Sequence, residues 1–185
     1  AAKALAAALA SRGSVIVSGL AAGIDRAAHE GALAAQTASG EPGRTAAVLG
    51  TPLSRIYPPE NAALGLAIAQ SGLILSETAQ IAALADDAET RAASLRRRNR
   101  IVAALALGTV VMAARPGSST LIEARASLEI GRPVLIWHEA AGDDWAKAWR
   151  EADPRDKAGA PLIRVVSSAD EVDEALSPWR RVWWL

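Results

Sequence analysis

The sequence predicts an α/β domain in which helices cover both faces of a mainly parallel sheet, giving a three-layer sandwich. Three observations favour this class. Short β-branched runs alternate with helical segments, the connections between them are mostly short, and residues 14–33 (SVIVSGLAAGIDRAAHEGAL) join a strand, a glycine turn and a helix directly. Ligands of such sheets bind at the carboxyl ends of the strands, so the turns that follow the strands are the candidate functional segments.

Strands are predicted where aliphatic and β-branched residues form short continuous runs, because strands of a parallel sheet are buried on both faces. In chain order these runs lie at 15–17, 44–49, 73–75, 109–112, 133–137 and 163–166. A chain of this class usually starts on a central strand, whereas this sequence starts on a helical stretch. We therefore expect its first strand to be missing.

Helices are predicted where apolar residues recur three and four positions apart and where Gly, Ser or Thr marks an end. In chain order these segments lie at 1–11, 25–36, 60–71, 101–107, 120–130, around Trp145 and Trp149, and at 168–176. Residues 78–95 are Ala-rich with several acidic side chains and no strong period. We expect a partly helical surface segment there.

The composition excludes several classes of site. The chain has 185 residues, 51% of them hydrophobic, which is enough for one buried core. Lys and Arg total 20, as do Asp and Glu, so net charge favours neither nucleic acid nor membrane as a partner. The absence of cysteine excludes disulfides and thiolate chemistry, and two histidines argue against a transition-metal site. We therefore expect no metal.

Membrane contact is not expected. No apolar run approaches the ~20 residues that cross a bilayer. The opening AAKALAAALA is too short for a signal peptide and carries Lys3. We predict a cytoplasmic protein.

The glycine turn after the first predicted strand is a candidate anion site. Gly19 and Gly23 bracket it, and a helix begins near Asp25. Glycine permits positive φ and close backbone approach, while a helix start presents unpaired N–H groups, so a phosphate suits this position. The alternative is an ordinary strand-to-helix turn, in which glycine is present only for steric reasons. The carboxyl-end rule places further residues at the same edge: Ser18, Gly50, Ser76, Glu77 and the 115–120 turn.

A run of basic residues is the second candidate. Arg96, Arg97, Arg98 and Arg100 surround Asn99, and we expect them at a helix N-terminus. Cations there oppose the helix dipole, so the cluster calls for an anionic partner. Several planar guanidinium groups in a row suit a polyanion better than one small anion. A solvated helix terminus is the alternative.

Two loops carry further candidates. The loop 51–59, TPLSRIYPP, has three prolines, which forbid a helix and hold Arg55 and Tyr57 on a stiff connection. The segment PGSSTLIE, 116–123, places hydroxyls at a helix start. Ordinary capping and a phosphate nest explain those hydroxyls equally well.

His29 and the tryptophans of the carboxyl end have simpler explanations. His29 follows Asp25 by one helical turn, which suits either a carboxylate-oriented base or a local helix pair. We prefer the pair, because no third ligand or nucleophile is evident. Trp179, Trp183 and Trp184 could stack bases, but aromatic residues near a terminus more often dock on their own domain or a second subunit.

Together these segments resemble the DprA (Smf) family of DNA-processing proteins. The resemblance is carried by residues 18–33, 43–64, 73–77, 97–108 and 127–134, and VLG followed by RIYPPEN is highly specific. The resemblance implies a Rossmann-like domain, which we place at 1–177, before a Trp-rich tail at 178–185. It also implies a homodimer that binds single-stranded DNA in a basic pocket and helps load the recombinase RecA in natural transformation, without catalysis or cofactor.

The residues expected to contact DNA or phosphate combine these candidates. They are Ser18, Gly19, Gly23, Asp25, Gly50, Arg55, Arg97, Arg98, Asn99, Arg100, Ser118, Ser119 and Thr120.

The sequence departs from the family pattern in three places. Ala22 stands where members often carry Lys or Arg, and the family's first strand and glycine-arginine loop would lie upstream of Ala1. PGSSTLIE is closer to the LOG-like nucleotide-binding relatives. The alternative function is therefore nucleotide binding or nucleoside-monophosphate phosphoribohydrolase chemistry, with Glu123 as the acid/base.

Overall fold

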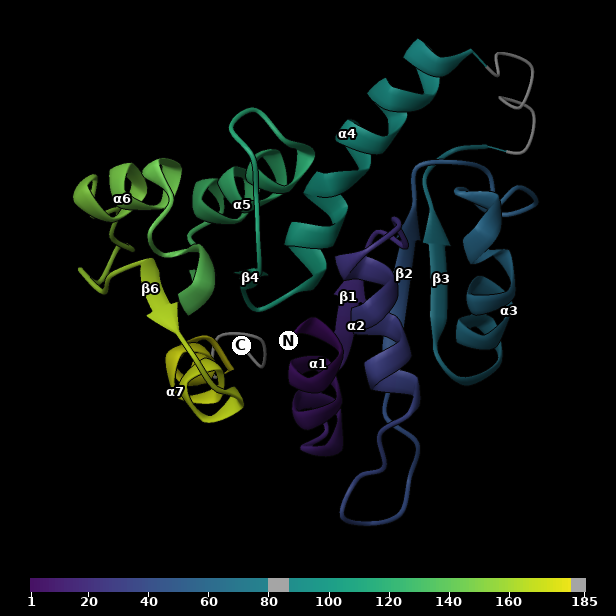
Figure 1. The fold of residues 1–185 in the computed structure, drawn as a ribbon, viewed down its shortest axis with the longest axis horizontal. Coiled ribbons are helices and arrows are strands. Elements are labelled where there is room, and N and C mark those ends of the chain that lie inside the picture. Colours follow the sequence, from purple (N-terminus) through teal and green to yellow (C-terminus); the bar gives the residue numbers. More distant parts are fainter. Residues whose placement is uncertain (80–86, 181–185) are drawn as a thin grey trace. The chain divides into compact units, whose positions relative to one another are not determined.

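The structure is a computed structural model that describes residues 1–79 and 87–180. The chain divides into two compact units, Ala1–Val102 and Ala103–Leu185, and each holds a three-stranded parallel sheet with helices packed on it (Figure 1). The predicted α/β class with parallel strands is confirmed. Its six predicted strands are all present, and they form two three-stranded sheets.

The first unit is built on the sheet β1-β2-β3. Its elements are α1 Ala2–Ser11, β1 Ile16–Ser18, α2 Ile24–Leu33, β2 Thr45–Leu49, a 3-10 turn η1 Pro59–Asn61, α3 Ala62–Ser71, β3 Leu73–Ser76 and α4 Ala88–Leu105, within which the unit boundary falls. Strand β2 pairs in parallel with both neighbours, Ile16 lying opposite Thr45 and Ala46 opposite Leu73.

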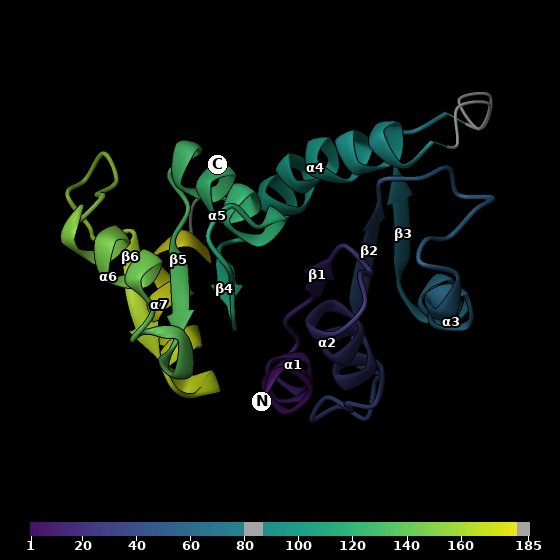
Figure 2. The same cartoon turned by 45° about the horizontal axis from the view of Figure 1, so that its top comes forward.

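The core of the first unit forms around β2, which is buried along its whole length, as its apolar run predicts. Leu20, Leu49 and Ile68 fill it, each at most 1% exposed. Helices α1 and α2 lie side by side (Figures 1 and 2), and a Cβ on Gly31 would meet the Lys3 carbonyl oxygen at 2.2 Å. Close approach of these two helices therefore requires glycine at that position.

The second unit is built on the sheet β4-β5-β6. Its elements are β4 Thr109–Val111, α5 Ser119–Glu129, β5 Val134–Trp137, a 3-10 turn η3 His138–Ala140, α6 Asp144–Glu151, β6 Ile163–Val166 and α7 Ala169–Arg180. The central strand β5 is again buried throughout. The core gathers around Val134 and Ile136, with Trp145 of α6 packed among aliphatic side chains.

Two helices differ most from their predicted bounds. The arginine cluster was expected at a helix start, but α4 begins at Ala88 and carries the arginines in its middle. The argument from the helix dipole is therefore wrong. Helix α7 continues past Leu176 to Arg180 and contains Pro178. Of the predicted surface segment 78–95, residues 80–86 lie outside the described residues.

Within residues 1–79 and 87–180, no helix has both the length and the apolar character that crossing a bilayer requires.

Candidate nucleic-acid interface

The carboxyl ends of β1, β2 and β3 meet at one edge of the first sheet, because the strands are parallel. Polar groups tie the ends of β2 and β3 together. The Ser76 hydroxyl donates to the Thr51 carbonyl at 2.7 Å, and the Thr78 hydroxyl donates to the Gly50 carbonyl at 3.1 Å. The parallel register thus brings together, within this sheet, the strand-end residues that the sequence gathered: Ser18, Gly19, Gly50, Ser76 and Glu77.

The glycine turn after β1 already holds a carboxylate. The backbone N–H groups of Gly19 and Ala21 both donate to Oδ2 of Asp25 at 3.1 Å. Gly23 has a φ of 86°, as expected of a turn glycine, and buried Leu20 takes a φ of 60°. The sequence assigned these N–H groups to an external phosphate. In the structure, Asp25 at the start of α2 accepts from two of them.

Asn61 also fixes this turn, a role that was not predicted from the sequence. Its side chain is fully buried and donates from Nδ2 to the Leu20 carbonyl at 2.9 Å. A backbone carbonyl in this tight turn thereby gains a partner inside the protein. The motif RIYPPEN, which ends at Asn61, carried the signal, because a buried amide after a proline-rich loop needs a hydrogen-bonding role.

The arginine cluster on α4 divides into an exposed pair and a buried pair. Arg97 and Arg100 lie three positions apart on the helix, and their side chains are 58% and 59% exposed. Arg98 and Asn99 are only 5% and 3% exposed and share the buried side of the helix with Val102. Helical spacing accounts for the division, because residues three or four apart lie on one face.

Arg98 is an internal cation in this structure. Its Nη1 donates to the Gly19 carbonyl at 2.7 Å and also to the Val48 carbonyl, while Nε donates to Oδ1 of Asn99 at 3.2 Å. The guanidinium therefore links α4 to the ends of β1 and β2. The sequence predicted Arg98 as an exposed phosphate ligand. In the structure its guanidinium is buried and donates to three acceptors inside the protein.

Gly19 and Gly50 allow the close approach of α4. A Cβ on Gly19 would lie 2.3 Å from the Arg98 Nη2, and one on Gly50 would lie 2.8 Å from the Leu95 Cα. Both strand-end glycines are thus required by helix packing, whatever ligand the edge binds.

The exposed arginines contact a carboxylate at the end of β3. Glu77 accepts from Arg97 Nε at 3.3 Å and from Arg100 Nη2 at 2.5 Å. Two cations share one anion, so the trio carries a net positive charge. An exposed guanidinium presents several N–H donors in a plane, which suits phosphate oxygens.

The proline-rich loop adds an aromatic ring to this unit. Tyr57 is 38% exposed, and the Arg91 guanidinium of α4 lies 5.0 Å from its ring centroid. Arg55 is exposed on the same loop, and its carbonyl accepts from the Thr51 hydroxyl at 2.7 Å.

His29 has a structural role. Thr45 donates its hydroxyl proton to the Ile16 carbonyl at 2.7 Å, so His29 Nδ1, 2.7 Å from that hydroxyl, is the donor to it. The tautomer therefore leaves Nε2 without a proton, and this buried atom has no hydrogen-bond partner among the described residues. Burial lowers the pKa of His29 to about 4, opposed by nearby Asp25 and reinforced by Arg98. In residues 1–79 and 87–180, no group of three His, Cys, Asp or Glu side chains could hold a metal ion.

The hydroxyl-rich turn lies in the second unit, after β4. Ser118 is the N-cap of α5, but its side chain makes no capping hydrogen bond, and its buried Oγ has no hydrogen-bond partner among the described residues. Ser118 and Thr120 line a depression of about 290 Å³ together with residues 113–115. Ser119 is exposed at the first position of the helix.

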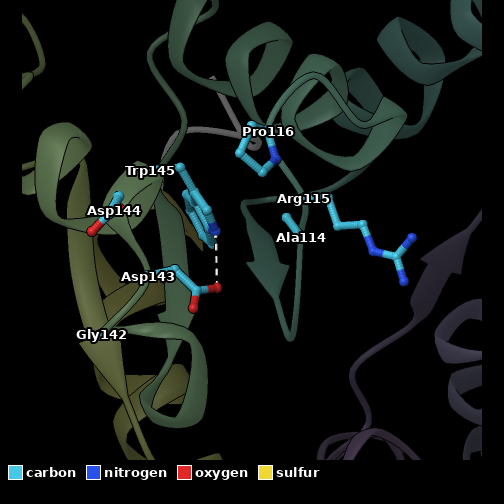
Figure 3. Close-up of a pocket in the computed structure, with 7 residues that line it drawn as sticks. All are labelled: Ala114, Arg115, Pro116, Gly142, Asp143, Asp144 and Trp145. Carbon is cyan, nitrogen blue, oxygen red and sulfur yellow. Dashed lines mark hydrogen bonds between the residues drawn. The ribbon is translucent and has the colours of Figure 1, made fainter.

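A second depression of about 400 Å³ adjoins this turn and is shown in Figure 3. Arg115 and Pro116 line one side and residues 142–145 the other. The Trp145 indole N–H donates to Asp143 Oδ2 at 3.0 Å, while the Arg115 guanidinium extends away from both. Glu123 lines neither depression and lies one residue beyond the first turn of α5.

Trp179 docks on its own unit, as expected. It is 9% exposed, and its indole N–H donates to the Gly131 carbonyl at 3.0 Å. Trp183 and Trp184 lie outside the described residues.

Comparison with known proteins gives a consistent result. Residues 1–168 match the sequence model of the family described as DNA recombination-mediator protein A. The chain is 44% identical to Protein Smf of Synechocystis sp. over 128 residues, which is 69% of this chain and 29% of that protein. It is 39% identical to DNA processing protein DprA of Streptococcus pneumoniae over 121 residues, 65% of this chain and 39% of that protein. The chain thus spans about a third of the length of these relatives.

Two solved structures are also similar. DNA processing protein A from Helicobacter pylori, studied for its single-stranded DNA binding mode, matches with a TM-score of 0.72 and 28% identity over 96% of this chain and 72% of that one. DprA from Streptococcus pneumoniae matches with a TM-score of 0.68 and 31% identity over 92% of this chain and 55% of that one.

Proposed function

The chain belongs to the DNA recombination-mediator protein A family, and from this premise we propose that it binds single-stranded DNA through the phosphate backbone. The observation that carries the proposal is the pair of exposed arginines, Arg97 and Arg100, beside the carboxyl edge of the first sheet. A solved relative from Helicobacter pylori is described as binding single-stranded DNA. Ligands of parallel sheets bind at the carboxyl ends of the strands. Exposed guanidinium groups beside those ends suit an anionic ligand.

The chemistry of this edge favours phosphates over bases. Arg97 and Arg100 project from α4, and Arg55 and Arg96 are exposed in the same unit. Guanidinium contacts to phosphates carry no sequence information, and they release counterions from the nucleic acid. Binding should therefore be indifferent to base sequence and weakened by salt.

The remaining predicted contacts take different roles in this proposal. Arg98 and Asn99 hold the glycine turn in place, and Asp25 occupies the N–H groups of Gly19 and Ala21. In the second unit, Ser119 and Thr120 offer hydroxyls at the start of α5 to a phosphate, whereas the Ser118 Oγ is buried. The other expected contacts, Ser18, Gly23 and Gly50, contribute through the backbone.

The wider role follows the family. We propose a non-catalytic, cytoplasmic protein that acts on single strands in natural transformation, forms a homodimer and helps load the recombinase RecA. Action on single strands needs the strand-binding edge, so that edge is tested first.

The test is a titration of a labelled oligo-dT with this chain at low salt. Replacing Arg97 and Arg100 together by Ala should weaken binding by tenfold or more, roughly, because two phosphate contacts are lost. The matched control replaces Arg155 and Arg180, two half-exposed arginines of the second unit that also contact carboxylates. That control loses the same charge and should bind within about twofold of the parent. Equal losses in the two double variants, or none, would contradict the proposed edge.

A further inference from the structure

Glu77 is the carboxylate that the two exposed arginines share. It directly follows β3, where Leu49 pairs with Ser76, so its backbone is fixed at the end of a paired strand. Its two oxygens are divided between the arginines, Oε1 with Arg97 and Oε2 with Arg100. Its side chain is 21% exposed. The carboxylate is therefore anchored, whereas the arginines reach it through long side chains.

A carboxylate and a phosphate make the same demand on these arginines. Each supplies oxygen acceptors to guanidinium N–H donors, and both favour paired contacts with Arg. A strand phosphate that approaches Arg97 and Arg100 must therefore displace Glu77 or share donors with it, against the repulsion of a neighbouring negative charge.

The existing ion pairs are easily exchanged. Both arginine side chains are more than half exposed and that of Glu77 is 21% exposed, so solvent screens these pairs and the long arginine side chains lose freedom in forming them. The trio carries two positive charges and one negative, so it still attracts a polyanion. On this balance of charge we expect Glu77 to lower the affinity of the edge for a polyanion without abolishing it.

We propose that Glu77 is an internal competitor of the DNA backbone, which tunes the affinity and release of the strand by holding Arg97 and Arg100 whenever phosphate is absent. This inference rests on the proposed single-strand binding function. An orienting role, in which Glu77 aims the arginines at phosphate, makes the opposite prediction for removal of its charge.

The experiment measures oligo-dT affinity of Glu77→Gln, which keeps the size of the side chain and removes its charge. At about 0.1 M salt, where the Debye length is about 10 Å, binding should tighten on the order of three- to tenfold. The control is Glu41→Gln. Glu41 precedes β2 and so lies at the amino ends of the strands, about 16 Å from the carboxyl edge by the length of β2. It should leave affinity within about twofold.

A second experiment distinguishes competition for the two arginines from a general effect of the Glu77 charge on DNA affinity. In the Arg97→Ala, Arg100→Ala double variant, Glu77→Gln should change oligo-dT affinity by less than about twofold. The two guanidinium groups for which Glu77 and phosphate compete are absent from that variant. Equal tightening in both backgrounds overturns the proposal, as does weaker or unchanged binding by Glu77→Gln while the parent binds; in these cases the proposed function stands. If neither the parent nor Glu77→Gln binds, the proposed function fails and this inference fails with it.

Discussion

The guanidinium of Arg98 fills the space that a side chain at position 19 would need. Nη1 of Arg98 lies 2.7 Å from the Gly19 carbonyl oxygen, and a Cβ on residue 19 would lie 2.3 Å from Nη2. The position of the Arg98 side chain therefore depends on the absence of a side chain at residue 19, although the two residues are 79 positions apart in the chain. This contact sets the position of the turn that follows β1.

Gly19→Ala should destabilise the first unit by about 1–3 kcal/mol, because the added methyl group overpacks a buried site. Urea denaturation measures the change. In an Arg98→Ala background the same substitution should cost less, since the clashing group is absent. An equal cost in both backgrounds would show that Arg98 is not what position 19 contacts.

Arg98→Ala should destabilise the chain by about 2–5 kcal/mol, since it leaves buried carbonyls without their donor. Arg97→Ala, which removes an exposed cation from the same helix, should cost less than about 1 kcal/mol. Comparison of their urea midpoints checks the distinction. Loss of DNA binding by Arg98→Ala without loss of stability would instead return Arg98 to the role of a direct phosphate ligand.

The burial of His29 should make stability fall in mild acid. Its pKa is lowered from 6.5 to about 4 in the folded chain, so between these values the unfolded chain takes up a proton that the folded chain does not. The stability that His29 contributes is complete above pH 6.5 and is lost as pH falls toward 4, on the order of 3 kcal/mol in total.

Carboxylates titrate in part of the same range, so the measurement is the difference between parent and His29→Gln in urea unfolding from pH 7 to pH 4. The parent should lose more stability than the variant across this window. Parallel pH profiles would contradict a depressed His29 pKa.

Substitution of Glu123 distinguishes the DNA-binding proposal from the nucleotide-hydrolysis alternative. It lines neither depression of the second unit, so we expect no base to be released when this chain is incubated with nucleoside monophosphates. Chromatography of the products provides the readout. Release by the parent that Glu123→Gln abolishes would favour the phosphoribohydrolase alternative.

Much of the fold could be predicted because its two central strands are buried on both faces. Residues 46–49 and 134–137 are continuous apolar runs in the sequence and belong to the fully buried central strands of the structure. The start of α4 could not be predicted in the same way, because the Ala-rich residues before Arg96 show no period that marks a buried face.

The site was predicted at the level of its segments and less well at the level of single residues. The glycine turn and Glu77 do follow predicted strand ends, whereas the arginines lie in the middle of α4 and not at the helix start that was predicted. The sequence alone did not distinguish the buried Arg98 from the exposed Arg97 and Arg100. Burial of Arg98 depends on the carbonyls of Gly19 and Val48, which are far away in the chain. One clue was present: Arg98 precedes buried Val102 by four residues, which places both on one helical face.

The most direct test of strand binding by the Arg97 and Arg100 edge is the salt dependence of oligo-dT affinity. For single strands the logarithm of the binding constant falls against the logarithm of salt by about 0.7 for each phosphate neutralised. We predict a linear fall for the parent and a slope that is shallower by about 1.4 when Arg97 and Arg100 are both replaced by Ala, corresponding to two lost contacts. A parent affinity independent of salt, or the same slope in parent and double variant, would contradict the account.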